Sequence, residues 1–97
     1  DSGEKTGEKV WRMPVGKEYD DDIKSAIADM KNVGSGRGAG ATSGAKFIEQ
    51  FTQGIPWAHI DIAGTVWADK DKGMNPTGAT GYGVRTLLKW ILMKSGK

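Results

Sequence analysis

The chain has 97 residues, a formal net charge of +2, fifteen glycines, one histidine and no cysteine. This length allows one small domain with a thin core and is too short for two. The missing cysteines exclude a disulfide framework and a thiolate metal site, and one histidine excludes a multi-histidine metal site. The weak charge does not indicate a nucleic-acid partner, and no apolar run suggests a membrane span or a signal peptide.

The chain opens on a polar stretch, residues 1–9, that has no apolar periodicity. We expect a tail or connector here. Because the chain begins at Asp1 without an initiator methionine, we also expect it to be a piece of a larger protein. A short apolar segment follows at residues 10–15, and Pro14 excludes it from the centre of a sheet, since proline lacks the N–H that a ladder needs.

A helix is predicted over residues 18–30. Its apolar residues recur at a period near 3.6, at Tyr19, Ile23, Ile27 and Met30. The acidic run of residues 20–22 lies near the expected start, where carboxylates favour the positive end of the helix dipole. The same run could bind a cation, but decoration of a helix start is the preferred interpretation.

Glycines crowd residues 34–44 and interrupt regular structure there. Helical spacing returns at Ala45, Ile48 and Phe51, and we expect this helix to end before Gly54. The pattern Gly38-x-Gly40-x-x-x-Gly44 loosely resembles a dinucleotide-binding turn, if residues 31–33 end a strand and Asp61 serves as the ribose-binding acid. Its spacing departs from G-x-G-x-x-G, so a structural loop is the preferred interpretation and a nucleotide-binding half-domain stays an alternative.

Residues 57–63 alternate two largely apolar faces between Pro56 and Gly64, which predicts a buried strand. His59 and Asp61 share one of these faces. A metal site or a nucleophile–base pair would need further groups that we do not find, so we expect a hydrogen-bonded pair within a sheet.

The stretch of residues 69–83 is polar and predicts a loop with a turn at Asn75-Pro76. It begins like a calcium-binding loop, but Thr80 stands where that loop needs a glutamate, so we reject a calcium site.

The last predicted helix has the clearest pattern. Its apolar residues follow i, i+3, i+4, i+7, i+8 spacing, at Val84, Leu87, Leu88, Ile91 and Leu92. The order of helices, strand and loops predicts an α/β architecture. The residues alone show no complete active site, so a non-catalytic binding or scaffold module also remains open.

Four segments read together resemble the C-terminal part of the catalytic domain of the leucyl aminopeptidase (cytosol aminopeptidase) family. Their order and spacing follow the family from about residue 3 to residue 93. The segments are Gly7-Glu-Lys-Val-Trp-Arg-Met-Pro14, Ala28-Asp-Met-Lys-Asn-Val33 running into Gly36-Arg-Gly-Ala-Gly40, Pro56-Trp-Ala-His-Ile-Asp-Ile-Ala-Gly-Thr65, and Gly78-Ala-Thr-Gly-Tyr-Gly-Val-Arg85.

The resemblance implies that residues 1–97 are one incomplete domain, a segment of a three-layer αβα catalytic domain with a mixed sheet between helices. The parent protein would be a cytoplasmic, homohexameric metallo-aminopeptidase that uses two divalent ions, zinc or manganese, to remove leucine-like N-terminal residues from peptides. The family's metal-binding and catalytic segment is absent from this chain. We therefore expect the 97 residues to bind no metal, to be inactive alone, and to supply sheet core, pocket wall and subunit contacts to the rest of the polypeptide.

The family's apolar pocket for the first substrate side chain takes part of its wall from the stretch that matches residues 61–66. By position, the resemblance implies that Ala63 and Val66 face this pocket and bind substrate. Small apolar residues there would leave room for a leucine-sized side chain, whose burial yields about 0.8 kcal/mol per methylene. The resemblance also implies an extended backbone near residues 28–31, which would shorten the helix predicted over residues 18–30.

Overall fold

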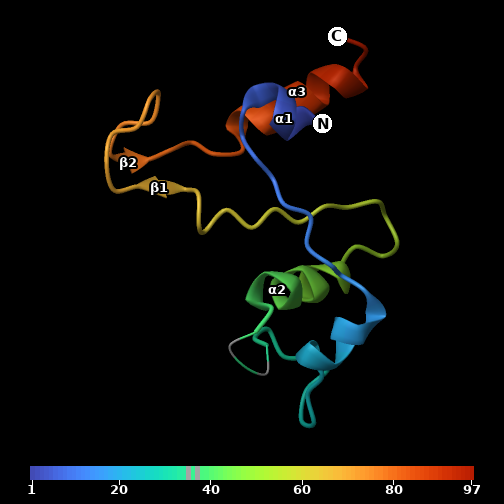
Figure 1. The fold of residues 1–97 in the computed structure, drawn as a ribbon. Coiled ribbons are helices and arrows are strands. Elements are labelled where there is room, and N and C mark those ends of the chain that lie inside the picture. Colours follow the sequence, from blue (N-terminus) through green and yellow to red (C-terminus); the bar gives the residue numbers. More distant parts are fainter. Residues whose placement is uncertain (35, 37) are drawn as a thin grey trace. The chain divides into compact units, whose positions relative to one another are not determined.

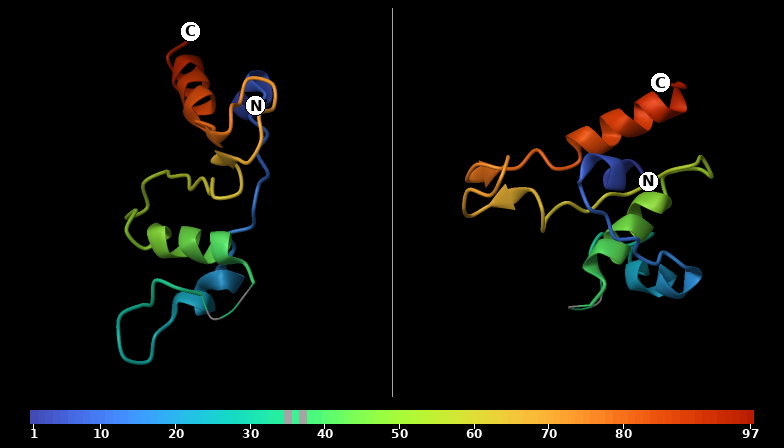
Figure 2. Two further views of the ribbon diagram at one scale, coloured as in Figure 1. Left: turned by 90° about the vertical axis from the view of Figure 1, so that its left-hand side faces the viewer. Right: turned by 45° about the horizontal axis from the view of Figure 1, so that its top comes forward.

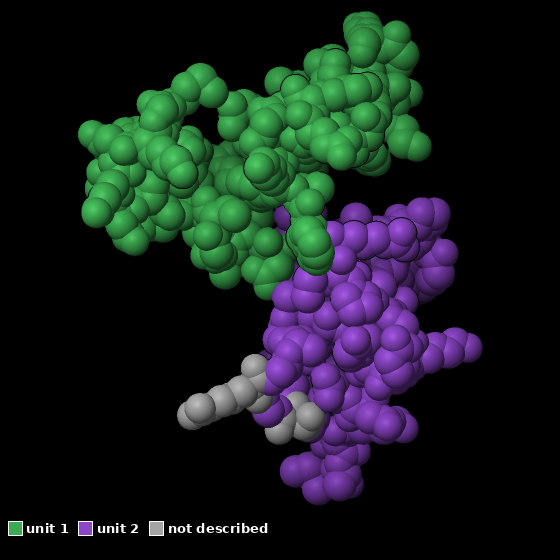
Figure 3. Space-filling model, in the orientation of Figure 1, with its two compact units in different colours: residues 1–11, 61–97 green, residues 12–60 purple. Residues whose placement is uncertain are grey.

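The computed structural model describes residues 1–34, 36 and 38–97, which form two compact units (Figures 1 and 3). One unit contains residues 1–11 and 61–97, and the other contains residues 12–60. None of the helices in these residues has the length and apolar character that a membrane span needs. The elements are α1 (Ser2–Thr6), the 3-10 helix η1 (Lys17–Ile23), α2 (Gly40–Glu49), β1 (Trp67–Ala68), β2 (Gly78–Ala79) and α3 (Val84–Lys94).

The prediction of a tail or connector over residues 1–9 is wrong, because residues 2–6 form the short helix α1. This helix packs against α3 (Figure 2). The Thr6 hydroxyl donates to the Ser2 carbonyl oxygen at 3.0 Å and lies 3.3 Å from the Thr86 hydroxyl. Gly7 ends α1 with a φ of 74°. A helix of five residues is too short to be stable alone. Its packing against α3 is therefore what orders it, and the local sequence carries no sign of that contact.

The predicted C-terminal helix is confirmed as α3, which begins after Gly83. Gly83 has a φ of 96°, a conformation that glycine adopts without steric cost. None of the α3 side chains is buried. Its apolar stripe is exposed to between 48% and 66% at four positions, Val84, Leu87, Leu88 and Ile91.

The strands β1 and β2 form a two-stranded antiparallel sheet in which Trp67 pairs with Ala79. The connection between them contains a bridge between Lys72 and Asn75. This connection turns at Gly73, whose φ is 59°, so the turn comes earlier than the predicted position at Asn75-Pro76.

The helix predicted over residues 18–30 is wrong beyond Ile23, where η1 ends. The Ser25 hydroxyl accepts hydrogen bonds from the backbone N–H groups of Ile27 and Ala28, at 3.3 and 3.1 Å. Serine thereby offers the backbone an alternative to the helical ladder. Ile27, a member of the predicted apolar stripe, is 97% exposed.

The second predicted helix is confirmed with different bounds: α2 begins earlier, at Gly40, and ends at Glu49, so that Phe51 of the predicted stripe lies outside it. α2 packs against η1. Ile23 and Ala45 are the buried apolar residues of the described chain. Polar bonds add to this packing, because the Ser43 hydroxyl donates to Asp22 at 3.0 Å and the Thr42 hydroxyl donates to the Pro14 carbonyl oxygen at 3.0 Å.

The strand predicted over residues 57–63 is wrong, since the structure shows no regular element there. A strand exists only through hydrogen bonds to a neighbouring strand. The described residues offer this segment no such neighbour, and alternation alone cannot replace one.

Candidate functional site

The segment that contains Ala63 and Val66 is a tight turn rather than a strand. The Asp61 carboxylate accepts a hydrogen bond from the Ala63 N–H at 3.1 Å, and the Ile62 carbonyl oxygen accepts from the N–H groups of Thr65 and Val66, each at 2.9 Å. We call residues 61–66 the pocket turn. These bonds close the turn on itself and present its side chains outward.

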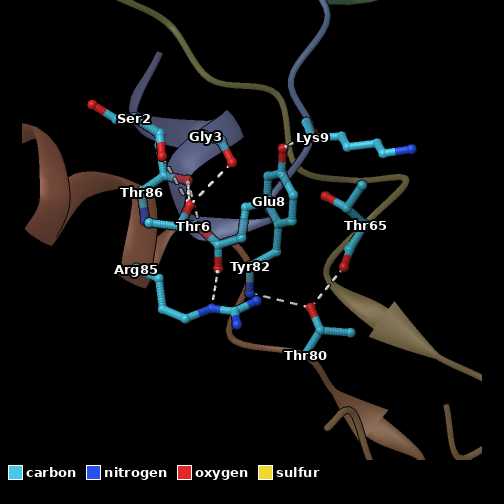
Figure 4. A network of polar contacts seen from close by, with 10 residues as sticks. All are labelled: Ser2, Gly3, Thr6, Glu8, Lys9, Thr65, Thr80, Tyr82, Arg85 and Thr86. Carbon is cyan, nitrogen blue, oxygen red and sulfur yellow. Dashed lines mark hydrogen bonds and ion pairs between the residues drawn. The ribbon is translucent and has the colours of Figure 1, made fainter. Parts of the chain in front are cut away.

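Thr80 fastens the pocket turn to the strand pair (Figure 4). Its hydroxyl donates to the Thr65 carbonyl oxygen at 2.6 Å, and its N–H donates to the Val66 carbonyl oxygen at 2.9 Å. The same hydroxyl accepts from the Tyr82 N–H at 3.2 Å. One residue thus holds two consecutive carbonyl groups of the turn.

The network continues from Tyr82 to the N-terminal segment. The Tyr82 hydroxyl donates to the Lys9 carbonyl oxygen (Figure 4). Beside Lys9, the buried Glu8 carboxylate accepts from the Thr86 N–H at 2.8 Å, from the Thr86 hydroxyl at 2.6 Å and from Arg85 Nε at 3.2 Å. Glu8 therefore caps the start of α3, where free N–H groups and the helix dipole favour an anion.

The surroundings of Glu8 also set its charge. Burial by itself raises the pKa of this carboxyl group, but the hydrogen bonds from Thr86 and Arg85 outweigh burial and hold the pKa below its ordinary value. Glu8 is therefore an anion at neutral pH, as a cap for the positive end of α3 requires.

Both predicted pocket residues lie on the surface of the described structure. Ala63 is exposed, and Val66 is 38% exposed. Two surface hollows include neither residue. One is lined by residues 49, 50 and 52–57, and the other by Thr6, Arg85, Leu88, Lys89 and Leu92. Within the described residues, the pocket turn is therefore an exposed surface turn that lines neither of these two hollows.

Sequence reasoning gave no role to Glu8, Thr80 or Tyr82. Glu8 fell in the expected tail, and the two others fell in the expected loop. The glycines beside Thr80 and Tyr82 could have indicated a functional backbone geometry there. Gly81 and Gly83 both adopt a positive φ. Such glycines mark a sharply turned backbone, which brings neighbouring side chains close to it.

The predicted pair His59 and Asp61 is not part of a sheet. Both residues are exposed, and the Asp61 carboxylate closes the pocket turn. Asp71, from the rejected calcium loop, accepts from both the N–H and the hydroxyl of Thr77, and these hydrogen bonds lower the pKa of its carboxyl group. Neither aspartate is placed as a catalytic base.

The acidic run of residues 20–22 is engaged by protein groups. Asp20 lies 2.6 Å from the ammonium group of Lys46, Asp21 pairs with Lys24 at 2.5 Å, and Asp22 accepts from Ser43. Lys46 is only 4% exposed and also pairs with Glu49. Hydrogen bonds to the carboxylates of Asp20 and Glu49 raise the pKa of Lys46. Asp20 and Asp22 therefore support the packing of η1 on α2, whereas Asp21 makes a local ion pair.

The described residues do not fit a metal centre. Nowhere in residues 1–34, 36 and 38–97 do three or more histidine, aspartate or glutamate side chains gather in a group that could hold an ion. A pair of divalent ions needs several such ligands from converging elements. No reaction step can be assigned to metal ligands in this part of the chain.

The described residues of the glycine-rich segment do not show the context of a dinucleotide site. Residues 31–34 are not a strand, and α2 begins at Gly40 after Ala39, whose φ is 54°. Asp61 does not end a strand either. Ser35 and Arg37 of this segment lie outside the described residues. The strand–turn–helix context that a dinucleotide fingerprint requires is missing from the described residues.

Comparison with known proteins gives the class. Residues 1–88 match the model of the cytosol aminopeptidase family, catalytic domain. The chain belongs to the cytosol aminopeptidase family, which confirms the resemblance stated from the four segments. Aminopeptidases of this family depend on metal ions.

The individual relatives agree with this assignment. A probable cytosol aminopeptidase of a Cyanothece species is 56% identical over 87 residues, which cover 90% of this chain and 17% of that protein. A probable cytosol aminopeptidase of Prochlorococcus marinus is 57% identical over 90 residues, which cover 92% of this chain and 18% of that protein. The chain thus spans less than a fifth of the length of these relatives.

A solved structure is similar as well. A mutant of tomato leucine aminopeptidase aligns with a TM-score of 0.82 and 46% identity, over 95% of this chain and 17% of that one. With its helices and small antiparallel sheet, the chain confirms the predicted α/β class. The matches favour a segment of a protein of the cytosol aminopeptidase family over the binding-module and nucleotide-binding alternatives.

Proposed function

We propose that the polypeptide containing this chain is a metal-dependent aminopeptidase that removes leucine-like N-terminal residues from peptides. The observation that carries the proposal is the pocket turn, which presents Ala63 and Val66 on a hydrogen-bonded frame within the family's catalytic domain. The two compact units would then be parts of one incomplete domain, residues 1–97, that the rest of the same polypeptide completes.

The proposed role of the pocket turn follows from the size of its side chains. An alanine and a valine are small and apolar, and they expose carbon atoms to whatever lies beside the turn. Such a wall favours a branched aliphatic side chain and offers no hydrogen bond to a polar one. We propose that these two residues bind the first side chain of the peptide.

The proposed metal ions belong to the rest of the polypeptide. The described residues bring together no set of ligands. We therefore assign two ions, zinc or manganese, to residues outside this chain and propose that this segment binds none. The residues of this chain bind and orient substrate; they do not activate water.

The exposed apolar stripe of α3 supports contacts beyond this chain. Leu87 and Leu88 are about half exposed, and exposed stripes of this kind are usually covered in the complete protein. We propose that the remainder of the polypeptide or a neighbouring subunit covers them, in a cytoplasmic homohexamer. The proposed location follows the name of the relatives, cytosol aminopeptidase.

The test of the pocket assignment is Ala63→Met in the complete polypeptide. The larger side chain fills the space for the substrate, so kcat/KM for a leucine amide should fall at least tenfold relative to an alanine amide, because losing room for one methylene is worth about 10- to 200-fold. The matched control is Ala28→Met, at an exposed alanine in the other unit, and it should leave the ratio unchanged. Equal effects of the two variants would refute the pocket assignment.

A second measurement tests which part of the protein holds the catalytic groups. The complete polypeptide should hydrolyse leucine amides when zinc or manganese is supplied, and a purified chain of residues 1–97 should not. Hydrolysis by the 97 residues alone would show that the catalytic groups had been assigned to the wrong part of the protein.

A further inference from the structure

Two hydrogen bonds from Thr80 control the backbone on both sides of Val66. The peptide group between Thr65 and Val66 carries the carbonyl oxygen that the Thr80 hydroxyl contacts at 2.6 Å. The next peptide group carries the carbonyl oxygen that the Thr80 N–H contacts at 2.9 Å. Because each peptide group is planar, fixing both groups fixes φ and ψ of Val66 and the direction of its Cβ atom.

The hydroxyl of Thr80 is itself oriented by its neighbours. It accepts from the Tyr82 N–H at 3.2 Å, so its own hydrogen is free to point at Thr65. Tyr82 is in turn tied to Lys9 through its hydroxyl (Figure 4). The donor that holds the pocket turn is thus anchored to a segment more than seventy residues away in the chain.

We propose that Thr80 is a positioning residue for substrate specificity: its hydroxyl fixes the backbone at Val66 and so sets where the wall of the pocket stands. Thr80 need not contact substrate for this effect, because it acts through Val66. The inference rests on the proposed function of the pocket turn and adds the residue that controls its geometry.

The experiment measures kcat/KM for a leucine amide and an alanine amide with the complete polypeptide. Thr80→Val keeps the size of the side chain and removes the hydroxyl, leaving the backbone bond to Val66 in place. We expect the leucine-to-alanine ratio to fall about fivefold, the factor that corresponds to one hydrogen bond of ordinary strength. Thr80→Ser retains the hydroxyl and should keep the ratio within about twofold of the wild type. A twofold change corresponds to the ordinary spread in the free-energy contribution of one hydrogen bond.

The matched control is Thr77→Val, which removes a threonine hydroxyl directly before β2, whereas Thr80 directly follows β2. The Thr77 hydroxyl contacts Asp71 and not the pocket turn. The ratio should therefore stay at the wild-type value. A loss of stability alone would lower kcat/KM for both substrates by the same factor, and it would not move the ratio.

A double-mutant cycle with Val66→Ala shows whether Thr80 acts through Val66. In that background Thr80→Val should change the ratio by less than about twofold, because residues that act through one another are not additive. Three results would overturn the inference. The first is a fivefold change of the leucine-to-alanine ratio that persists in the Val66→Ala background. The second is an unchanged ratio in Thr80→Val, and the third is a ratio that falls as far in Thr80→Ser as in Thr80→Val. If Thr80→Val does not fold, Thr80→Ala takes its place in the cycle.

The outcomes for the two proposals are distinguishable. A wild-type polypeptide that hydrolyses neither amide overturns the proposed function and this inference with it. A wild-type polypeptide that hydrolyses both, with a ratio unmoved by Thr80→Val, overturns the inference alone. Amide hydrogen exchange gives a readout without activity, because Thr80→Val should speed exchange at the N–H groups of Thr65 and Val66.

Discussion

Replacing Glu8 by glutamine tests whether a carboxylate from the N-terminal segment holds the start of α3. Three donor groups meet this carboxylate, the N–H and hydroxyl of Thr86 and the Nε of Arg85, at 2.8, 2.6 and 3.2 Å. Glutamine has almost the same shape and keeps one acceptor oxygen. The substitution therefore removes the charge without opening a cavity.

The magnitude follows from the strength of these bonds. A hydrogen bond to a charged group contributes about 1.5–3 kcal/mol, against about 0.5–1.5 kcal/mol for a neutral one, and an anion at a helix start adds about 0.3–1 kcal/mol. The Arg85 side chain is 47% exposed, so solvent screens its ion pair to a small contribution. We expect Glu8→Gln to lower the free energy of opening at this helix start by about 1–2 kcal/mol.

Amide hydrogen exchange at Thr86 measures this opening directly. A loss of about 1–2 kcal/mol corresponds to exchange about 5- to 30-fold faster. Glu4→Gln is the matched control, since Glu4 lies in α1 and is exposed. An acceleration below twofold in Glu8→Gln, or an equal one in Glu4→Gln, would refute the capping role.

The same carboxylate makes the opening depend on pH. Because the pKa of Glu8 is lowered in the folded state, its stabilisation is complete above the ordinary pKa of glutamate and is lost as the pH falls through the lowered value. The protection factor of Thr86, corrected for intrinsic exchange, should decline on acidification in the wild type. It should not show this decline in Glu8→Gln.

Three further substitutions follow from the structure, each measured by thermal unfolding of the complete polypeptide. Lys46→Met should lower the free energy of unfolding by about 1–3 kcal/mol, because it leaves Asp20 and Glu49 without their buried cation. In the wild type the pKa of Lys46 is raised, so the stabilisation from its positive charge should be lost only as the pH rises above the ordinary pKa of lysine. Gly83→Ala should cost about 1–2 kcal/mol, because a φ of 96° strains any residue with a Cβ atom, although no atom lies within 4 Å of the added carbon. Leu88→Ala should cost about 2–3 kcal/mol if the rest of the protein covers α3, whereas a loss below about 0.5 kcal/mol would show that Leu88 remains exposed.

The candidate site could be predicted only in part. The positions of Ala63 and Val66 came from matching a segment to a family and not from their chemistry, since neither side chain carries a reactive group. The residues that hold them were not found, because Thr80 and Tyr82 act through backbone groups of distant segments. Hydrogen bonds of that kind leave no periodic trace in the sequence.

Sequence by itself determined the two longer helices and the family. In α2 and α3 the apolar residues repeat at the helical period, and a helix closes its hydrogen bonds within its own segment. The four family segments kept their order and spacing along the chain, so the match needed no structure.

Tertiary structure alone decided the elements whose partners lie far away in the chain. The short helix α1 exists because it packs on α3, and residues 57–63 alternate like a strand but have no strand beside them among the described residues. Ser25 is a local case instead, because its hydroxyl accepts from N–H groups only two and three residues further along the chain, after the end of η1. In each case the outcome depends on whether a hydrogen bond or a contact is present, which periodicity does not record. The capping of α3 by Glu8 is the clearest example, because its donors lie more than seventy residues away.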